Sequence, residues 1–410
     1  MNINTSYPKN KINILLLENI SSNAVDEFKS EGYLNVKKIS AALDEEELID
    51  AIKEVHLLGI RSKTNITKNV LDHAQKLLAI GCYCIGTNQV NLIDATQKGV
   101  AVFNSPFPNT RSVAELVIAS AIMLLRKIPL KNKAAHDDIW LKDAKNCFEL
   151  RGKTLGIIGY GNIGMQVSVM AEALGMQVMY FDIDSKLTIG NAKQVHTLKE
   201  LLQHADVITL HVPEETSTQQ LINRDAMLQM KKGSILINFA RGTVVDLIAL
   251  KEMIETNHIG GAAIDVFPDE PEKNGDAFYS QLQNLPNILL TPHIGGSTEE
   301  AQLNISDDVT NKLLNFLEQG ITSGSHTIPA LNLPPHPDAH RILHIHKNVP
   351  GVLSEITNLL AAEKINILGQ YLKTNQEIGY VVLDVSTAIS KTMIASLKMV
   401  TNTIKMRVVY

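Results

Sequence analysis

The sequence of 410 residues has few cysteines, few aromatic residues and no long apolar segment. Its three cysteines, Cys82, Cys84 and Cys147, are too few for a disulfide framework. We expect reduced, structural thiols in a cytosolic protein, with a disulfide or a metal site as less favoured alternatives. No apolar run approaches the ~20 residues of a membrane-spanning helix. The first residues, MNINTSYPKNK, also lack a signal-peptide pattern.

Neither positive nor negative charge is in large excess. The formal net charge is −5 and no basic cluster stands out, so neither nucleic acids nor anionic membranes are expected partners. No metal site is predicted. Apolar residues make up 45% of the chain, which is enough for sizeable cores. The length predicts two or three domains.

The most informative stretch is Lys153–Asp182, in which glycines stand between two apolar runs. Gly159, Gly161 and Gly164 have the spacing G-x-G-x-x-G, after a strand-like run and before an amphipathic helical pattern. In a dinucleotide-binding unit the first glycine permits a tight turn and the second lets the backbone approach a pyrophosphate. The third lets helix and strand pack closely. Free N–H groups at the start of the helix would bind the phosphates.

Asp182 ends the second apolar run of this unit. A carboxylate there can accept hydrogen bonds from both hydroxyls of an adenosine ribose, and it would repel a 2′-phosphate. We therefore predict NAD rather than NADP as the cofactor. A glycine pattern alone can be an ordinary strand-to-helix turn, but the strand before it, the helix after it and the acid beyond favour the cofactor site.

Strand-like and helix-like segments alternate through most of the chain, which indicates doubly wound parallel sheets. The region before Asn104 has this pattern but no glycine fingerprint. Asn104–Asn109 contains two prolines and is predicted to be a linker. The helix predicted at Arg111–Arg126 is apolar nearly all round, so we expect it to be buried, either within its own domain or against another subunit.

Polar residues follow several of the later predicted strands. In open α/β sheets, ligands bind beyond the carboxyl ends of the strands, so these side chains should converge on one crevice. They are His211, Asn238, Arg241, Asp265, Glu270 and His293.

Three of these residues have the chemistry needed to oxidise a 2-hydroxy acid. Arg241 can hold a carboxylate with two hydrogen bonds. Glu270 beside His293 would fix the tautomer of the imidazole and make it more basic. Such a histidine can take the alcohol proton while NAD takes the hydride. Each residue alone would be interpreted as structural or solvated, whereas the three together, behind an NAD fingerprint, favour catalysis.

The C-terminal segment has a different pattern. Gly320–His340 is rich in proline and polar residues and is predicted to be a linker. Beyond it the predicted order is strand, helix, strand, strand, helix, strand within ~70 residues, the order of a ferredoxin-like fold. This module has no acid–base set, so we expect it to bind a ligand or to mediate assembly.

Several stretches together resemble the D-isomer-specific 2-hydroxyacid dehydrogenase family over nearly all of residues 11–320. They read GIRSKT, FNSPFPNTRSVAELV, LGIIGYGNIG, INFARGTVVD, GAAIDVFPDEP and LLTPHIGGST. The later segment HIHKNVPGVL resembles an ACT domain. The resemblance implies two Rossmann-like domains and a ferredoxin-like ACT domain. The expected boundaries are 1–108 with 297–337 for the substrate-binding domain, 109–296 for the NAD-binding domain and 338–410 for the ACT domain.

The resemblance also implies roles for single residues. The catalytic residues would be Arg241, Glu270 and His293. The residues that contact NAD would be Gly159, Gly161, Asn162, Ile163, Gly164, Asp182, His211, Phe239, Ala240, Arg241, Asp265, His293, Ile294, Gly295 and Gly296. The substrate, expected to be 3-phosphoglycerate, would be bound by Arg61, Ser62, Lys63 and Arg241. Lys63 stands where an arginine is expected, and exposed loop charge is the alternative interpretation for both Arg61 and Lys63.

The resemblance further implies L-serine as an effector, bound by His346, Asn348 and Asn366 near one edge of the ACT sheet. The alternative is that these residues only cap a helix and a strand edge. A glycine pair is expected before the ACT domain, but His336–Arg341 reads HPDAHR. Because Pro337 restricts backbone rotation, we expect weak coupling of serine binding to catalysis. Dimers through the NAD-binding domain and tetramers through the ACT domains are expected.

Two other functions stay open on the sequence. One is a different member of the same family, such as a D-lactate dehydrogenase or a hydroxypyruvate reductase. The other is a non-catalytic NAD(H)-sensing corepressor built on the same fold. The ACT-like segment and Arg61 argue against the first, and the ACT-like segment with the lack of partner-binding tails argues against the second.

Overall fold

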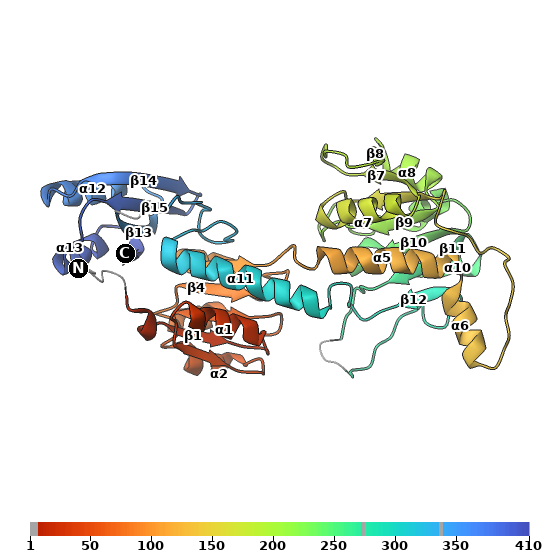
Figure 1. Ribbon diagram of the computed structural model, residues 1–410, viewed down its shortest axis with the longest axis horizontal. Coiled ribbons are helices and arrows are strands. Elements are labelled where there is room, and N and C mark those ends of the chain that lie inside the picture. The colour runs from red at the N-terminus through yellow and green to blue at the C-terminus, as the bar shows by residue number, and fades with distance from the viewer. Residues whose placement is uncertain (1–6, 272–274, 336–338, 410) are drawn as a thin grey trace. The chain divides into compact units, whose positions relative to one another are not determined.

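The computed structural model describes residues 7–271, 275–335 and 339–409 and divides into two compact units (Figure 1). Unit 1 comprises residues 1–108 and 302–410, and unit 2 comprises residues 109–301. Among the described residues, unit 1 contains two sheets and unit 2 contains one.

The first sheet of unit 1 is parallel, with the strand order β2-β1-β3-β4-β5. Its strands are β1 (Asn13–Leu16), β2 (Asn35–Lys38), β3 (Leu57–Ile60), β4 (Ala79–Cys82) and β5 (Ala101–Asn104). The accompanying helices are η1 (Lys9–Lys11), α1 (Ser22–Ser30), α2 (Glu45–Ile52), α3 (Lys68–His73) and α4 (Leu92–Gln97). Strands β3, β4 and β5 are buried along their whole length, as expected for parallel strands covered on both faces.

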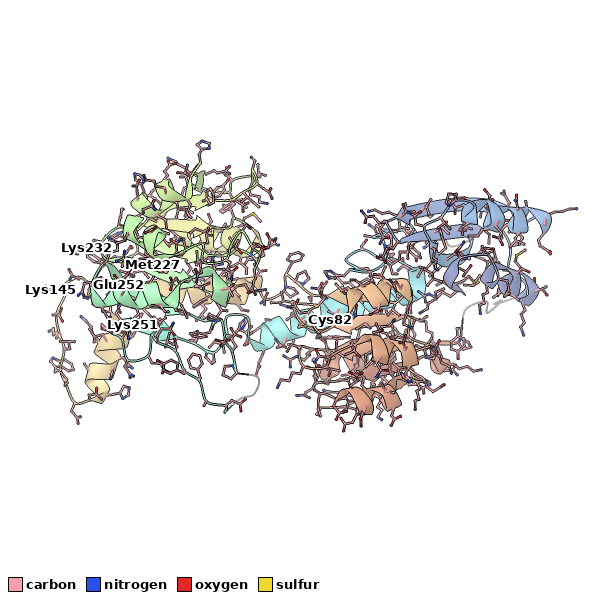
Figure 2. All side chains as sticks on the ribbon, turned by 180° about the vertical axis from the view of Figure 1, so that it is seen from behind. Cys82, Lys145, Met227, Lys232, Lys251 and Glu252 are labelled. Atoms are coloured by element: carbon pink, nitrogen blue, oxygen red, sulfur yellow. The ribbon has the colours of Figure 1, made fainter. Side chains whose placement is uncertain are left out.

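The cysteines differ in burial, and only Cys82 lies in a hydrophobic core. All three are free, and the side chain of Cys82 lies buried in β4 (Figure 2). Burial raises the pKa of the Cys82 thiol, which therefore stays protonated and unreactive. This agrees with the predicted structural role.

The sheet of unit 2 is also parallel, with the order β12-β11-β10-β9-β6-β7-β8. Its strands are β6 (Thr154–Ile158), β7 (Gln177–Phe181), β8 (Lys193–Gln194), β9 (Val207–Leu210), β10 (Ser234–Asn238), β11 (Ile259–Ile264) and β12 (Ile288–Leu290). Its helices are α5 (Thr110–Leu125), α6 (Ile128–His136), α7 (Asn162–Ala173), α8 (Leu198–His204), α9 (Arg224–Gln229), α10 (Leu247–Glu255) and η2 (Gly242–Val244). Figure 2 shows Met227 of α9 and Lys251 and Glu252 of α10 within this unit. The strand order changes direction around β6, so the loop that follows β6 lies at a topological switch point.

Helix α5 is buried chiefly within its own unit. It packs against α7, β10 and β11. Val113, Val117 and Leu124 are among its buried side chains, whereas Ile122 is exposed. Of the two alternatives that the sequence left open, the structure therefore favours burial inside the domain for most of this helix.

Helix α11 (Glu299–Gln319) precedes the second sheet of unit 1, which is antiparallel with the order β14-β15-β13-β16. The strands are β13 (His340–Lys347), β14 (Ile367–Thr374), β15 (Ile378–Val385) and β16 (Thr403–Val408), and the helices are α12 (Val352–Ala362) and α13 (Lys391–Lys398). This is the predicted βαββαβ order. The fold class, two doubly wound parallel sheets with a ferredoxin-like module, is confirmed.

The central strands of the antiparallel sheet, β13 and β15, are buried on both faces. One face packs on α12 and α13. On the other face, Leu343, Tyr380 and Val382 share a core with Phe316 and Leu317 of α11 and with the first sheet. The ferredoxin-like module is thus packed into unit 1 through a continuous apolar core.

Polar contacts join the same sheet to the end of α11. Arg341 is fully buried and forms a bidentate ion pair with Asp384 at 2.7 and 2.8 Å. Side chains of the sheet donate to carbonyl oxygens at the end of α11: Arg341 to Gln319, Tyr380 to Gly320, and Arg407 to Leu317 and Phe316. The last carbonyls of a helix have no partner inside it, so these donors act as its C-terminal caps.

The segment that follows α11 is packed rather than free. In its described part, residues 320–335, the side chains of Thr322 and Thr327 are buried. Thr327 Oγ1 accepts from the N–H of Val102 at 3.0 Å and donates to the carbonyl of Val100 at 2.7 Å. The prediction of a linker is therefore wrong for this part, because tertiary contacts with β5 fix its conformation. Residues 336–338, with Pro337, lie outside the described residues, so the predicted hinge is not tested.

Candidate active site

The glycine turn after β6 has the geometry of a phosphate cradle. Gly159 has φ +91°, and a Cβ there would lie 2.6 Å from the carbonyl oxygen of His211. A Cβ on Gly164 would lie 2.4 Å from the carbonyl oxygen of Gly159, whereas a Cβ on Gly161 would meet nothing within 4 Å. Helix α7 begins at Asn162 without a side-chain cap. Open space therefore faces uncapped N–H groups at a helix start, which fits a pyrophosphate.

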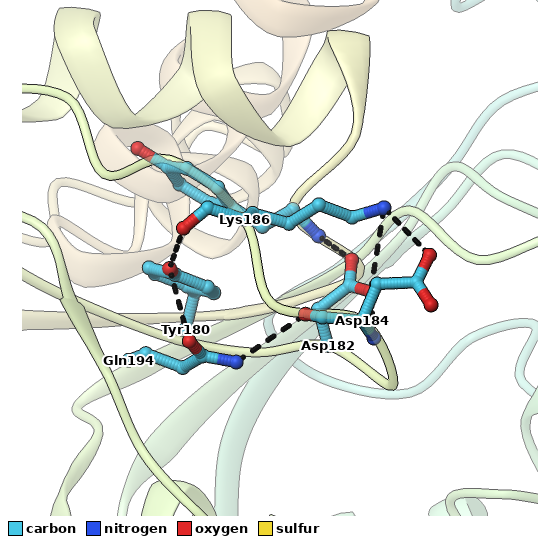
Figure 3. A network of polar contacts seen from close by, with 6 residues as sticks. Tyr180, Asp182, Asp184, Lys186 and Gln194 are labelled. Atoms are coloured by element: carbon cyan, nitrogen blue, oxygen red, sulfur yellow. Dashed lines mark hydrogen bonds and ion pairs between the residues drawn. The ribbon is translucent and has the colours of Figure 1, made fainter.

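Asp182 lies at the end of β7 and is tied to this turn (Figure 3). Its Oδ2 accepts from the N–H of Tyr160 at 2.8 Å, and its Oδ1 accepts from the N–H of Asp184 at 2.9 Å. Lys186 Nζ lies 3.9 Å from Asp182 Oδ1 and 2.8 Å from Asp184 Oδ2. The lysine was not singled out from the sequence. A cation beside the acid that is predicted to bind the ribose bears directly on the choice between NAD and NADP.

His293 and Glu270 meet, although 23 positions separate them in the chain. His293 Nδ1 lies 2.7 Å from Glu270 Oε2, and Glu270 Oε1 accepts from the N–H of Phe267 at 3.0 Å. The His293 side chain is 52% exposed. A carboxylate on Nδ1 leaves Nε2 as the ring nitrogen available to a ligand.

The loop that carries His293 is anchored by Asp265. The Asp265 side chain is buried, and it accepts from Thr291 Oγ1 at 2.6 Å and from the N–H groups of Ile294 and Gly295 at 2.8 Å each. His293 has φ +54° and donates its N–H to the carbonyl of Asp265 at 2.8 Å. A left-handed non-glycine residue costs about 1–3 kcal/mol and persists only where its surroundings hold it. Gly296, which ends this loop, packs on Asn109, the N-cap residue of α5.

Arg241 is exposed and stands on a turn that Asn238 shapes. The buried Asn238 accepts from the N–H of Ala240 at 3.1 Å and donates to the carbonyl of Arg241 at 2.9 Å. Phe239 and Ala240 are buried between them. The guanidinium donates to the carbonyl of Ala240 at 2.7 Å. Among the described residues it forms no hydrogen bond with Glu270 or His293, and because the side chain is exposed its other donors face solvent.

His211 follows β9 and lies beside the glycine turn. Its carbonyl contacts Gly159, and its Nε2 lies 3.0 Å from Thr209 Oγ1. Burial lowers the pKa of His211 to about 3, so the ring is neutral. Its buried Nδ1 has no hydrogen-bond partner among the described residues. No group of three or more potential metal ligands occurs in the same described part of the chain.

Comparisons with known proteins agree with this geometry. Residues 118–295 match the family described as D-isomer specific 2-hydroxyacid dehydrogenase, NAD binding domain, and residues 342–405 match the AHAS small subunit-like ACT domain. The D-3-phosphoglycerate dehydrogenase of Dictyostelium discoideum is 48% identical over 410 residues, covering 100% of both chains. That of Haemophilus influenzae is 48% identical over 405 residues, covering 99% of both. A solved D-lactate dehydrogenase from Sporolactobacillus sp. has a TM-score of 0.68 and 32% identity, covering 77% of this chain and 98% of that chain.

The chain belongs to the D-isomer-specific 2-hydroxyacid dehydrogenase family. It is an NAD-dependent oxidoreductase with a C-terminal ACT domain. No helix among the described residues is long and apolar enough to cross a membrane.

In this dehydrogenase the loop after β3 is built around Glu18, a residue that sequence reasoning missed. Glu18 is buried, and its carboxylate accepts from the N–H groups of Arg61, Lys63 and Thr64 at 3.1, 3.0 and 2.9 Å. Arg61 Nη2 donates to Gln302 Oε1 at 2.8 Å. Ser62 and Lys63 are exposed. One buried carboxylate thus fixes the backbone from which Arg61, Ser62 and Lys63 extend.

The three predicted effector residues do not converge within one ACT domain. Strand register aligns His346 with Gly379 and Gly379 with Thr374, whereas Asn366 precedes the other end of β14. At ~3.3 Å per residue, Asn366 therefore lies on the order of 20 Å along the strands from His346. His346 is buried, and Asn348 is exposed and donates to the carbonyl of Asn375 at 2.7 Å.

We predict that Asp182→Ala changes the preference between the two cofactors. Loss of the carboxylate should weaken NADH binding by about 10- to 100-fold, because a hydrogen bond to a charged group is removed. NADPH binding should strengthen, because Lys186 no longer has Asp182 beside it and can pair with the 2′-phosphate. Titrations followed by nicotinamide fluorescence measure the dissociation constants of NADH and NADPH. The double variant Asp182→Ala with Lys186→Ala should lose the gain for NADPH, and an unmodified enzyme that prefers NADPH would contradict the assignment.

Proposed function

We propose that this enzyme oxidises 3-phospho-D-glycerate to 3-phosphohydroxypyruvate, the first step of the phosphorylated route to L-serine. Support comes from relatives named D-3-phosphoglycerate dehydrogenase that match over the full length. The observation that carries the chemistry is the 2.7 Å contact between His293 Nδ1 and Glu270 Oε2. Free thiols, including buried Cys82, support a cytosolic location.

In the proposed mechanism His293 is the general base. Its Nε2 takes the proton of the substrate hydroxyl, and Glu270 on Nδ1 holds the tautomer and stabilises the imidazolium that forms. NAD, when bound at the glycine turn, supplies the hydride acceptor. The free N–H groups of α7 and the carboxylate of Asp182 are the groups that would hold it. In the reverse direction the protonated His293 returns its proton to the carbonyl oxygen.

Two arginines divide the recognition of the substrate in this proposal. Arg241, whose guanidinium is exposed on the turn after β10, binds the carboxylate in a bidentate manner. Arg61, with Ser62 and Lys63, binds the phosphate. Glu18 positions these three residues, because its carboxylate holds the backbone of their loop.

The proposed effector is L-serine, bound between two copies of the chain. His346 and Asn348 lie at one end of the ACT sheet and Asn366 at the other, so one domain cannot supply all three to one ligand. Strand β14 is an edge strand with Leu368 and Leu372 exposed. Antiparallel pairing of two β14 edges brings Asn366 of one copy towards His346 of the other. We accordingly propose dimers through the NAD-binding domain and tetramers through the ACT domains.

The substrate is tested by NADH formation from 3-phospho-D-glycerate, D-glycerate and D-lactate. We expect kcat/KM to be at least ~100-fold higher for the phosphorylated acid, because the phosphate adds charge-assisted hydrogen bonds. Arg61→Met should remove most of this preference, whereas Arg151→Met, an exposed arginine of unit 2, should leave it unchanged. Faster turnover of D-lactate would instead favour the function of the Sporolactobacillus relative, and no turnover of any acid would favour a non-catalytic sensor.

We predict that His293→Ala lowers kcat by about 10²–10⁴-fold, the usual contribution of a general acid–base group. NADH binding should change little, because the cofactor is held mainly at the glycine turn and Asp182. Stopped-flow measurement of hydride transfer and a fluorescence titration separate the two effects. His204→Ala, an exposed histidine on α8, is the matched control. A His293→Ala enzyme with near-normal turnover would refute the mechanism.

We predict that L-serine binds the intact enzyme and that Asn348→Ala and Asn366→Ala each remove binding. Each variant removes half of a shared site, so each should abolish the calorimetric signal alone. Asn311→Ala, an exposed amide on α11, should bind serine normally. Serine can control catalysis only by favouring one arrangement of the domains through differential affinity. Because Pro337 restricts backbone rotation before the ACT domain, we expect maximal inhibition by serine to be incomplete. Serine binding that needs only one of the two asparagines would contradict the shared site, and complete inhibition would contradict weak coupling.

A further inference from the structure

A cavity of about 600 Å³ lies inside unit 1, where the ACT sheet meets the first sheet. We call it the β16 cavity. Its walls come from the segment around η1, from the first sheet, from the last turn of α11, and from α13 and β16. Small-molecule sites commonly have volumes of about 300–1,000 Å³. None of the catalytic, cofactor or serine-site residues lines this cavity.

The walls of the β16 cavity are mainly apolar. The apolar side chains that line it include Ile12, Leu78, Leu317, Ile394, Met406 and Val408. Most of these residues are more than nine-tenths buried. Met406 and Val408 lie on β16, whereas Ile12 and Leu78 immediately precede strands β1 and β4 of the first sheet. A hydrocarbon body placed there would be removed from water, which is favourable by roughly 25 cal/mol per Å² of apolar surface.

The charged groups of the cavity are predominantly cationic. Lys9 pairs with Glu318, so these two charges compensate each other. Lys398 forms no ion pair among the described residues. Arg407 donates to the carbonyls of Leu317 and Phe316 and has no carboxylate partner in the same part of the chain. Burial lowers the pKa of Arg407, as expected for a cation without a nearby anion. Among the described residues, two positive charges therefore face the cavity without a carboxylate paired to them.

His56 and β16 add neutral donors to the cavity. His56 Nδ1 accepts from the N–H of Asn13 at 3.1 Å, so the ring proton is on Nε2, and burial lowers the pKa of His56 and keeps the ring neutral. The N–H of Val409 donates to Arg341 in β13. Along an edge strand of an antiparallel sheet, the N–H and C=O groups of successive residues point alternately to the neighbouring strand and away from it. The N–H and C=O groups of Met406 and Val408 therefore point away from β13, to the open edge of the sheet.

We propose that the β16 cavity binds a small organic monocarboxylate with an aromatic or branched hydrocarbon body. The carboxylate is held by Lys398 with the Nε2–H of His56, and the body packs on the apolar walls. Such a ligand would contact Leu317 in the last turn of α11, where the ACT sheet caps the helix. The cavity exists only while the ACT domain is packed on the rest of unit 1. A ligand that binds there would therefore stabilise this packing.

The test uses the full-length enzyme with NADH and two probes, 3-phenylpropionate and its neutral isostere 3-phenylpropanamide. Calorimetry should show binding of the acid, and the amide should bind about tenfold more weakly, because it cannot make charge-assisted hydrogen bonds. Lys398→Gln should weaken binding of the acid several-fold without affecting the amide. Lys391→Gln, on the same helix but outside the cavity, is the matched control and should change neither constant.

A second variant separates the cavity from the other sites. Ile394→Trp should fill the space and abolish binding of both probes, and its thermal midpoint shows whether the protein is folded. The double variant Asn348→Ala with Asn366→Ala should bind both probes normally. The proposal is overturned if 3-phenylpropionate does not bind, or if the acid and the amide bind with equal affinity. It is also overturned if Lys391→Gln weakens binding of the acid as much as Lys398→Gln does.

Discussion

The carboxylate of Asp265 is the constraint on which the catalytic geometry depends. It accepts hydrogen bonds from Thr291, Ile294 and Gly295, and so fixes a loop that lies nearly 30 positions away in the sequence. That loop holds His293 at φ +54°, a conformation that the residue would not adopt unaided. Because the loop is held, His293 Nδ1 reaches Glu270 and its Nε2 is left available to a ligand. A buried acid thus holds the histidine in the left-handed conformation in which its ring meets Glu270.

Elements with a long or regular pattern were predictable from the sequence. The strand expected at Leu155–Ile158 is β6, and the βαββαβ order of the ACT domain was also predicted. The prediction succeeded because buried parallel strands read as apolar runs and amphipathic helices have a regular period. Strand β2, with the sequence NVKK, and the six-residue helices α3 and α4 were missed. They are short and largely polar, so tertiary contacts rather than local pattern define them.

The supporting residues of the site were harder to find. Glu18 and Lys186 act on loops, through backbone groups or neighbouring charges, and no spacing in the sequence marks such partners. Asn238 was expected at the crevice, but its bonds to the backbone of the turn were not predicted. Composition also misled. Residues 320–335 contain several prolines and polar residues, which suggested a free linker. Yet the Thr327 hydroxyl accepts a hydrogen bond from Val102 in β5 and donates one to Val100 just before it. A loop composition predicts irregular backbone, and it does not predict mobility.

The ACT domain is best understood through the two edges of its sheet. Strand β14 is an edge strand, and its side chains Leu368 and Leu372 are exposed. Strand β16 faces the enzyme's own first sheet, and from its neighbourhood Arg407, Arg341 and Tyr380 cap the end of α11. That helix begins three residues after Gly296 of the catalytic loop. The donors from β13, β15 and β16 hold the last turn of α11, so the packing of the ACT domain within unit 1 and the geometry at that end of the helix depend on each other.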